Sequence, residues 1–149
     1  MRATSKTLLV ALLLCAGSVA AAQTLTGSWV HRGQSEYGLW LDTEQNKNVV
    51  KFQLEVSRGA PSYNTGWIQG EVELKNNAGR FTKTTDSGLC EISFHFDAKR
   101  VELKQEGDYS GCGFGHNVFA IGTLKRTSHK QPKFCVGDPR TGGCDNESP

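Results

Sequence analysis

The stretch that best indicates the fold is Val50-Lys51-Phe52-Gln53-Leu54-Glu55-Val56, in which apolar and polar residues alternate without a break. A period of two places successive side chains on opposite faces of an extended chain. The stretch is therefore predicted to be a β-strand with one buried face and one solvated face.

The same alternation recurs along the chain. Residues 92–96 and 101–104 repeat it on either side of a turn at 97–100, which predicts a hairpin of 89–96 with 100–105. Further strands are expected at 27–30, 37–41, 68–74, around Phe81 and at 118–124, with Gly70 marking a β-bulge. About eight short strands without a helical period predict an all-β fold, a single antiparallel meander closed as a small barrel or sandwich.

The first 22 residues have the features of a signal peptide. Arg2 and Lys6 precede a short apolar run, and Ala20-Ala21-Ala22 supplies a cleavage pattern, so cleavage is expected after Ala22. Lipidation at Cys15 is the alternative, but Leu14 stands where lipoprotein processing needs a small residue. The apolar run is too short to span a bilayer. We therefore expect a periplasmic or secreted protein without a membrane anchor.

The mature chain, residues 23–149, is long enough for one core and too short for two. We expect a β-domain over 23–126 and a C-terminal tail over 127–149. Arg2 and Lys6 leave with the signal peptide, so 15 of the 17 basic residues remain against 15 acidic residues. A neutral mature chain disfavours binding to nucleic acid or to a membrane surface.

Four cysteines remain after cleavage, namely Cys90, Cys112, Cys135 and Cys144. An even number in a short exported chain favours disulfide bonds, for which three pairings are possible. We favour Cys90–Cys112 and Cys135–Cys144, because each pair lies within one segment of similar character. The tail would then carry a small disulfide loop. The spacing lacks any CxxC, so no metal site is expected.

Two loops and the tail contain the candidate partner-binding residues. The segment 58–67 holds Arg58, Tyr63, Asn64 and Trp67, residue types that often anchor protein interfaces. A place in the core is the alternative for the two aromatic residues. The glycine-rich segment 110–117 adds Phe114 and His116, and the predicted tail loop adds Arg140. The alternative for His116 is a hydrogen-bonded turn. The alternative for the tail loop is a disulfide that only protects the C-terminus from proteolysis.

Catalysis has little support in the sequence. The four histidines are scattered without metal-binding spacing, and the serines lack a G-x-S-x-G elbow. Glu71 and Glu73 are expected on the same side of one strand, whereas a glycosidase needs carboxylates on two sides of a sugar. We therefore expect neither an enzyme nor a cofactor.

Three resemblances bear on function. Residues 58–66, 90–94 and 112–123 together resemble a group of small, β-rich bacterial periplasmic or secreted proteins of unassigned function, over about residues 49–126. In architecture alone, the chain resembles periplasmic lysozyme inhibitors and immunity proteins, which push a loop into an enzyme's cleft. Gly27-Ser28-Trp29 is similar to the Gly-x-Trp of lipocalins and avidins.

The leading hypothesis is an envelope binding protein, an inhibitor or immunity factor whose loops occlude a secreted, periplasmic or wall-degrading enzyme. The alternatives are a calycin-like barrel that binds a small ligand and a structural envelope protein. A carrier should have a cavity lined by Trp29, Phe52 and Phe94. An inhibitor should instead bring 58–67 and 110–117 together on one exposed rim.

Overall fold

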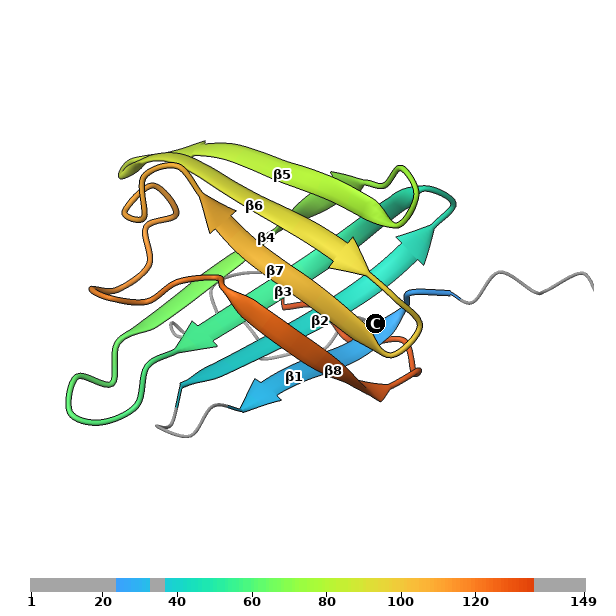
Figure 1. Ribbon diagram of the computed structural model, residues 1–149, viewed down its shortest axis with the longest axis horizontal. Coiled ribbons are helices and arrows are strands. Elements are labelled where there is room, and N and C mark those ends of the chain that lie inside the picture. The colour runs from blue at the N-terminus through green and yellow to red at the C-terminus, as the bar shows by residue number, and fades with distance from the viewer. Residues whose placement is uncertain (1–23, 33–36, 136–149) are drawn as a thin grey trace, which may run out of the picture.

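The computed structural model describes residues 24–32 and 37–135 (Figure 1). Eight antiparallel strands form one sheet, and no helix occurs in these residues. The strands are β1 (Gly27–Arg32), β2 (Gly38–Asn46), β3 (Val49–Ser57), β4 (Thr65–Glu73), β5 (Ala78–Thr85), β6 (Gly88–Phe96), β7 (Arg100–Glu106) and β8 (Gly122–Ser128). The predicted all-β meander is confirmed. Among the described residues, no helix is long and apolar enough to cross a membrane.

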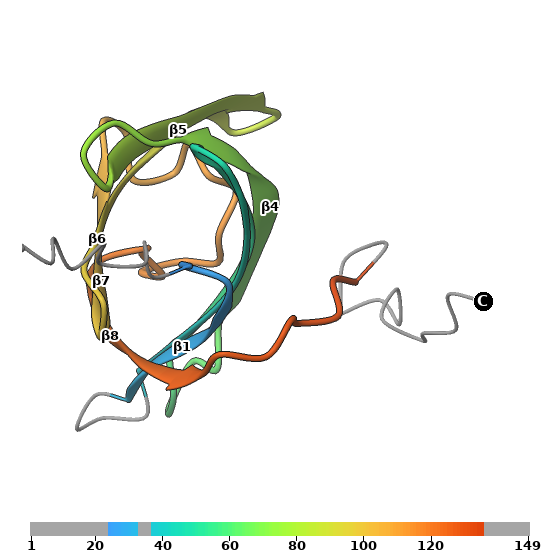
Figure 2. The same ribbon diagram turned by 90° about the vertical axis from the view of Figure 1, so that its right-hand side faces the viewer.

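The sheet curls into a nearly closed barrel (Figure 2). Its strand order is β4-β3-β2-β1-β8-β7-β6-β5, so the closing step of the meander is the pairing of β1 with β8. The hairpin of 89–96 with 100–105 is confirmed as β6 and β7, which join through the turn at 97–99. At the seam between β4 and β5, the structure has the bridge of Lys75 with Ala78.

Gly70 has a different role from the predicted bulge. Its register with Phe52 on β3 is continuous, and the irregularity of the sheet falls between Ser28 and Trp29 on β1. A Cβ at Gly70 would lie 2.3 Å from Cε2 of Phe81. The prediction of a bulge was therefore wrong: the glycine makes room for the Phe81 ring where β4 faces β5.

Aromatic side chains fill the barrel. Trp29, Phe52, Phe94 and Phe96 are at most 2% exposed. Ring centroids lie 5.7 Å apart for Trp29 and Phe96, 4.8 Å for Phe52 and Phe94, and 6.0 Å for Phe94 and Phe96. Nε1 of Trp29 donates a 2.8 Å hydrogen bond to Oγ1 of buried Thr43, so the polar edge of the indole is also satisfied.

The two ends of the barrel differ in their connections. The connections β3–β4, β5–β6 and β7–β8 share one end, at the left of Figure 1. The longest of them, residues 107–121, crosses the barrel mouth and is called the cap here, and its end of the barrel is the cap end. The opposite end carries the short connections β2–β3, β4–β5 and β6–β7 and is called the turn end.

The strand predicted at 118–124 is only partly correct. β8 begins at Gly122 and ends at Ser128, two residues beyond the predicted domain boundary. Val118 and Ala120 belong to the cap and are buried, at 1% and 0% exposure. They alternate as strand residues do because the cap turns its apolar side chains into the barrel mouth without joining the sheet.

The first predicted disulfide is confirmed, with Cys90 on β6 bonded to Cys112 in the cap. Cys135 is also disulfide-bonded, whereas Cys144 lies outside the described residues, so its pairing stays a prediction. The start of the tail lies on the outer face of β3. There the Lys51 ammonium lies 4.7 Å from the centroid of the Phe134 ring, and the Cys135 N–H donates to Oε1 of Gln53 at 3.2 Å.

Candidate functional site

The two loops singled out in the sequence meet at the cap end. Nδ2 of Asn64 donates a 2.8 Å hydrogen bond to the carbonyl of His116, and the Gly115 N–H donates to the carbonyl of Thr65 at 3.0 Å. Residues 58–64 and the cap are therefore neighbours on one rim, although about fifty residues of chain separate them. This is the arrangement expected of the inhibitor hypothesis.

The loop at 58–64 presents Tyr63 to solvent. The Arg58 N–H donates to the carbonyl of Asn64 at 2.8 Å, and the Tyr63 N–H donates to the carbonyl of Gly59 at 3.1 Å, so the loop closes on itself. Tyr63 is 68% exposed and has a φ of 49°, in the left-handed region that non-glycine residues avoid. Such a conformation persists only where the surrounding structure imposes it, and it often accompanies function.

The cap is fixed to the barrel by covalent and polar contacts. The Cys90–Cys112 disulfide attaches its middle to β6. Gln105, only 2% exposed at the end of β7, donates from Nε2 to the carbonyl of Tyr109 and accepts from the Ala120 N–H, both at 2.9 Å. Because this one amide holds both ends of the cap, the cap behaves as part of the barrel.

A third attachment holds the cap from the side of β4 and β5. Phe114 is half-buried against the core, and a Cβ at Gly66 on β4 would lie 2.3 Å from its ring. Oγ1 of Thr85, at the end of β5, donates to the carbonyl of Gly111 at 2.6 Å. Phe114 therefore supports the cap from below, and its predicted contact with a partner stays a prediction.

The remaining predicted residues lie in different places. His116 is exposed on the rim, and Arg58 is half-exposed beside it. Trp67 is half-buried and points outward from β4 between inward-facing Gly66 and Ile68, so it belongs neither to the core nor to the rim. Arg140 lies outside the described residues.

Exposed apolar side chains gather at the cap end. Of the described residues, the large apolar ones that are exposed are Trp40, Tyr63, Leu89, Tyr109 and Ile121. Each lies in the 58–64 loop, in the cap, or within three residues of a strand end at the cap end. The turns of the opposite end contain asparagine, lysine and aspartate instead. The exposed large apolar side chains of the described residues therefore lie toward the cap end, whose loops also carry exposed polar residues such as Asp108, His116 and Asn117.

Sequence reasoning missed Trp40, Leu89, Tyr109 and Ile121, although a signal for Tyr109 was present. Tyr109 stands in Gly107-Asp108-Tyr109-Ser110-Gly111, where every neighbour favours a turn. Its ring contacts Phe119 edge-on at a centroid distance of 4.9 Å. A large aromatic residue inside a turn-forming segment has no strand face to bury it, and this marks it as an exposed candidate.

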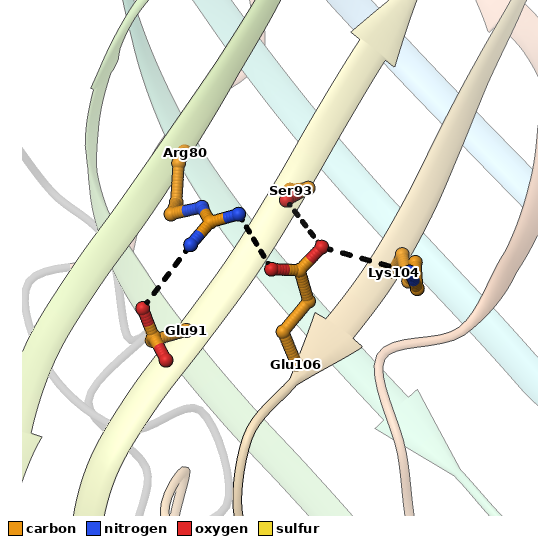
Figure 3. Close-up of polar contacts among 5 residues, drawn as sticks. All are labelled: Arg80, Glu91, Ser93, Lys104 and Glu106. Atoms are coloured by element: carbon orange, nitrogen blue, oxygen red, sulfur yellow. Dashed lines mark hydrogen bonds and ion pairs between the residues drawn. The ribbon is translucent and has the colours of Figure 1, made fainter.

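An ion-pair network lies on the outer face of β5, β6 and β7 (Figure 3). Glu91 and Glu106 are opposite each other in the β6–β7 register, and Arg80 pairs with both, at 3.5 Å and 2.6 Å. Glu106 also accepts from Oγ of Ser93 at 3.2 Å and lies 3.7 Å from Nζ of Lys104. Both Glu106 oxygens are engaged, and half-exposed pairs of this kind contribute at most about 1 kcal/mol each. The network braces the sheet beside the cap.

Within residues 24–32 and 37–135, no group of three His, Cys, Asp or Glu side chains could hold a metal ion.

Burial raises the pKa of Tyr37, whose hydroxyl donates to the carbonyl of Phe119 in the cap. The hydroxyl therefore stays protonated at neutral pH and serves to hold the cap.

The comparisons add no relative to this geometry. No family model, no curated protein and no solved structure matches the chain. The function must therefore be argued from the site itself.

Proposed function

We propose that this protein is an exported binding protein of the cell envelope that docks a secreted or periplasmic enzyme through its cap end. The mechanism is steric occlusion, in which the 58–64 loop and the cap cover the entrance of the enzyme's cleft. The observation that carries the proposal is the gathering of exposed apolar side chains on this one rim.

Preorganisation of the rim supports the proposal. Docking costs free energy for every side chain and loop that must be ordered. Here the Cys90–Cys112 bridge and buried Gln105 already hold the cap, and hydrogen bonds across Asn64 join it to the neighbouring loop. A rim fixed before contact loses less entropy on binding. Tyrosine suits such a rim because it offers a large contact area with few rotatable bonds.

The composition of the rim also matches the composition of protein interfaces. Their centres are enriched in aromatic residues and depleted in charged ones. Tyr63 and Tyr109 are 68% and 55% exposed. These two side chains are the anchors that we expect to enter pockets of the partner.

A carrier of small ligands fits the packing less well. The side chains that a cavity would require as its lining, Trp29, Phe52 and Phe94, are in contact with other rings in the core. An eight-stranded barrel is just wide enough for side chains to fill it. Opening a pocket would require the loss of this aromatic packing.

The test uses the mature chain, residues 23–149, carrying an affinity tag. We expect it to capture an enzyme from culture medium or an envelope extract and to inhibit that enzyme in proportion to the protein added. The variant Tyr63→Ala/Tyr109→Ala should lose both capture and inhibition. The control Lys47→Ala/Lys75→Ala, at the turn end, should retain both. Equal capture by the two variants, or capture without inhibition, would contradict the proposal.

A further inference from the structure

The turn end carries a cluster of cations, called the basic patch here. Lys99, Arg100, Lys125, Arg126 and His129, together with Asp97 and Ala98, line a shallow hollow of about 580 Å³. Its lining residues belong to the β6–β7 turn, the start of β7 and the end of β8 with the residue that follows it. The β6–β7 turn and the end of β8 are at the right of Figure 1. The hollow is at the opposite end of the barrel from the cap and is independent of the proposed function.

The strand register brings like charges together in the basic patch. Arg100 on β7 is directly opposite Lys125 on β8. Like charges in such a cross-strand pair destabilise a sheet. Lys99 and Lys125 form no ion pair with any other residue in the described part of the chain. The cross-strand pair of Arg100 and Lys125 therefore lacks a full counter-charge within these residues.

Asp97 is the acidic residue of the hollow, and its carboxylate is already engaged. Oδ1 accepts from the N–H groups of Lys99 and Arg100, both at 2.7 Å, and Oδ2 lies 3.2 Å from Nε of Arg100. These hydrogen bonds, foremost the one from the Lys99 N–H, lower the pKa of Asp97. The next carboxylate along β7, Glu102, is opposite Thr123 and does not line the hollow. One turn-forming carboxylate thus faces four permanent cations.

Arg126 is held rigidly beside the hollow. Nη2 donates to the carbonyls of Thr24 and Thr26 at 2.7 Å and 2.6 Å, and the guanidinium carbon lies 4.6 Å from the Trp29 ring. Nε is buried without a hydrogen-bond partner among the described residues. A cation fixed in place by the barrel needs no reorganisation when an anion arrives.

We propose that the basic patch binds a phosphate group. A phosphate monoester carries more than one negative charge and three acceptor oxygens, so it satisfies several cations at once. The guanidinium geometry of Arg100 suits a phosphate, and the ammonium groups of Lys99 and Lys125 add point charges. Arg126 contributes its charge alone, because its Nη2 already donates to two carbonyls. A single carboxylate would neutralise only one of the four cations. The neutral composition of the mature chain concealed this patch, because its positive charge is balanced elsewhere on the surface.

The test measures binding of two phosphate probes to the mature chain near physiological ionic strength. One probe is pyrophosphate in solution, and the other is a vesicle of phosphatidylcholine that contains phosphatidic acid, whose headgroup is a phosphate monoester. Binding of pyrophosphate would indicate a soluble phosphate ligand, and binding of the vesicle alone would indicate a lipid headgroup; both results support the patch. Binding of neither probe would overturn the proposal.

Charge-matched variants locate the binding. Lys99→Gln/Lys125→Gln removes two exposed, unpaired cations of the patch and should weaken binding at least about tenfold. Lys83→Gln/Lys104→Gln removes the same charge from β5 and β7 outside the hollow and should change binding less than about twofold. Equal weakening by the two variants would reduce the effect to net charge and refute a site. Circular dichroism before each titration confirms that both variants are folded.

Discussion

Replacing Tyr63 by alanine and by glycine tests whether its backbone is held in the left-handed region. Both variants lose the same ring, so the loss of side-chain contacts cancels between them. Alanine keeps a Cβ, which costs about 1–2 kcal/mol in a left-handed conformation. Glycine avoids this cost but loses about 0.5–1 kcal/mol through its freer unfolded chain. At a φ of 49°, Tyr63→Gly should therefore be more stable than Tyr63→Ala by about 0.5–1 kcal/mol.

Urea unfolding of both variants measures this difference, provided that the slopes agree. Ser62 supplies the matched control, because it is an exposed neighbour in the same loop without a positive φ. There the order should reverse, with Ser62→Ala more stable than Ser62→Gly by about 0.5–1 kcal/mol. If Tyr63→Ala equals or exceeds Tyr63→Gly in stability, the left-handed backbone at Tyr63 is refuted.

The same two variants separate stability from binding. Removing an anchor of an interface costs about 2 kcal/mol or more, which is roughly 30-fold in affinity. Both variants should lose this affinity for the captured enzyme, despite their different stabilities. Retained affinity in the glycine variant would show that Tyr63 is not an anchor.

Three further predictions concern the cap and the seam. Cys90→Ala/Cys112→Ala should lose about 3 kcal/mol in urea unfolding, because the bridge closes a loop with a sequence separation of 22, and a loss below about 1 kcal/mol would contradict this tether. Gly70→Ala should lose about 1–3 kcal/mol because its Cβ would meet the Phe81 ring, and Phe81→Leu in the same chain should restore part of the loss. Tyr37→Phe should lose about 1 kcal/mol at pH 7. Since the folded pKa of Tyr37 is raised, this contribution is present below pH 10 and declines as the pH rises through the folded pKa, and unfolding of the variant should lack that step.

Alternation predicted the strands well because it reports a local property. Each inward residue of 50–56 needs only its neighbours to define a buried face, and β3 contains the whole stretch. The hairpin of β6 and β7 followed from two such stretches and one turn. Even the weak segment around Phe81 forms β5, with Phe81 buried at the seam.

The wrong predictions concern residues whose environment is not set by pairing within their own strand. Val118 and Ala120 alternate and are buried, yet they belong to the cap, because a loop that closes a barrel mouth also needs an apolar side. Gly70 was predicted to be a bulge because it lacks a side chain. A glycine stands there because the Phe81 ring across the seam occupies the space that a Cβ would need. Both depend on segments that meet only after the barrel has closed.

The candidate site was predictable in its parts and not in its assembly. Turn chemistry and residue type indicated 58–67 and 110–117 as loops with interface residues. Their contact through Asn64 and His116 depends on the pairing of β1 with β8, which no local pattern specifies. The local pairing of β3 with β4 separates Trp67 from Tyr63: Trp67 lies opposite Glu55 in a strand and points outward, whereas Tyr63 remains on the rim.

The filled interior explains why function should be sought at the two ends. Trp29, Phe52 and Phe94 occupy the space that a carrier would leave open, so the barrel acts as a rigid support for its connections. At the cap end, a disulfide and a buried glutamine hold a loop whose exposed apolar side chains gain no burial unless a partner covers them. At the turn end, Arg100 and Lys125 are held opposite each other, and Asp97 pairs with Arg100, whereas Lys125 has no ion-pair partner among the described residues. Under the two proposals, a protein partner would cover the first surface and a phosphate would occupy the second. Because the two surfaces lie at opposite ends of the barrel, neither ligand would obstruct the other.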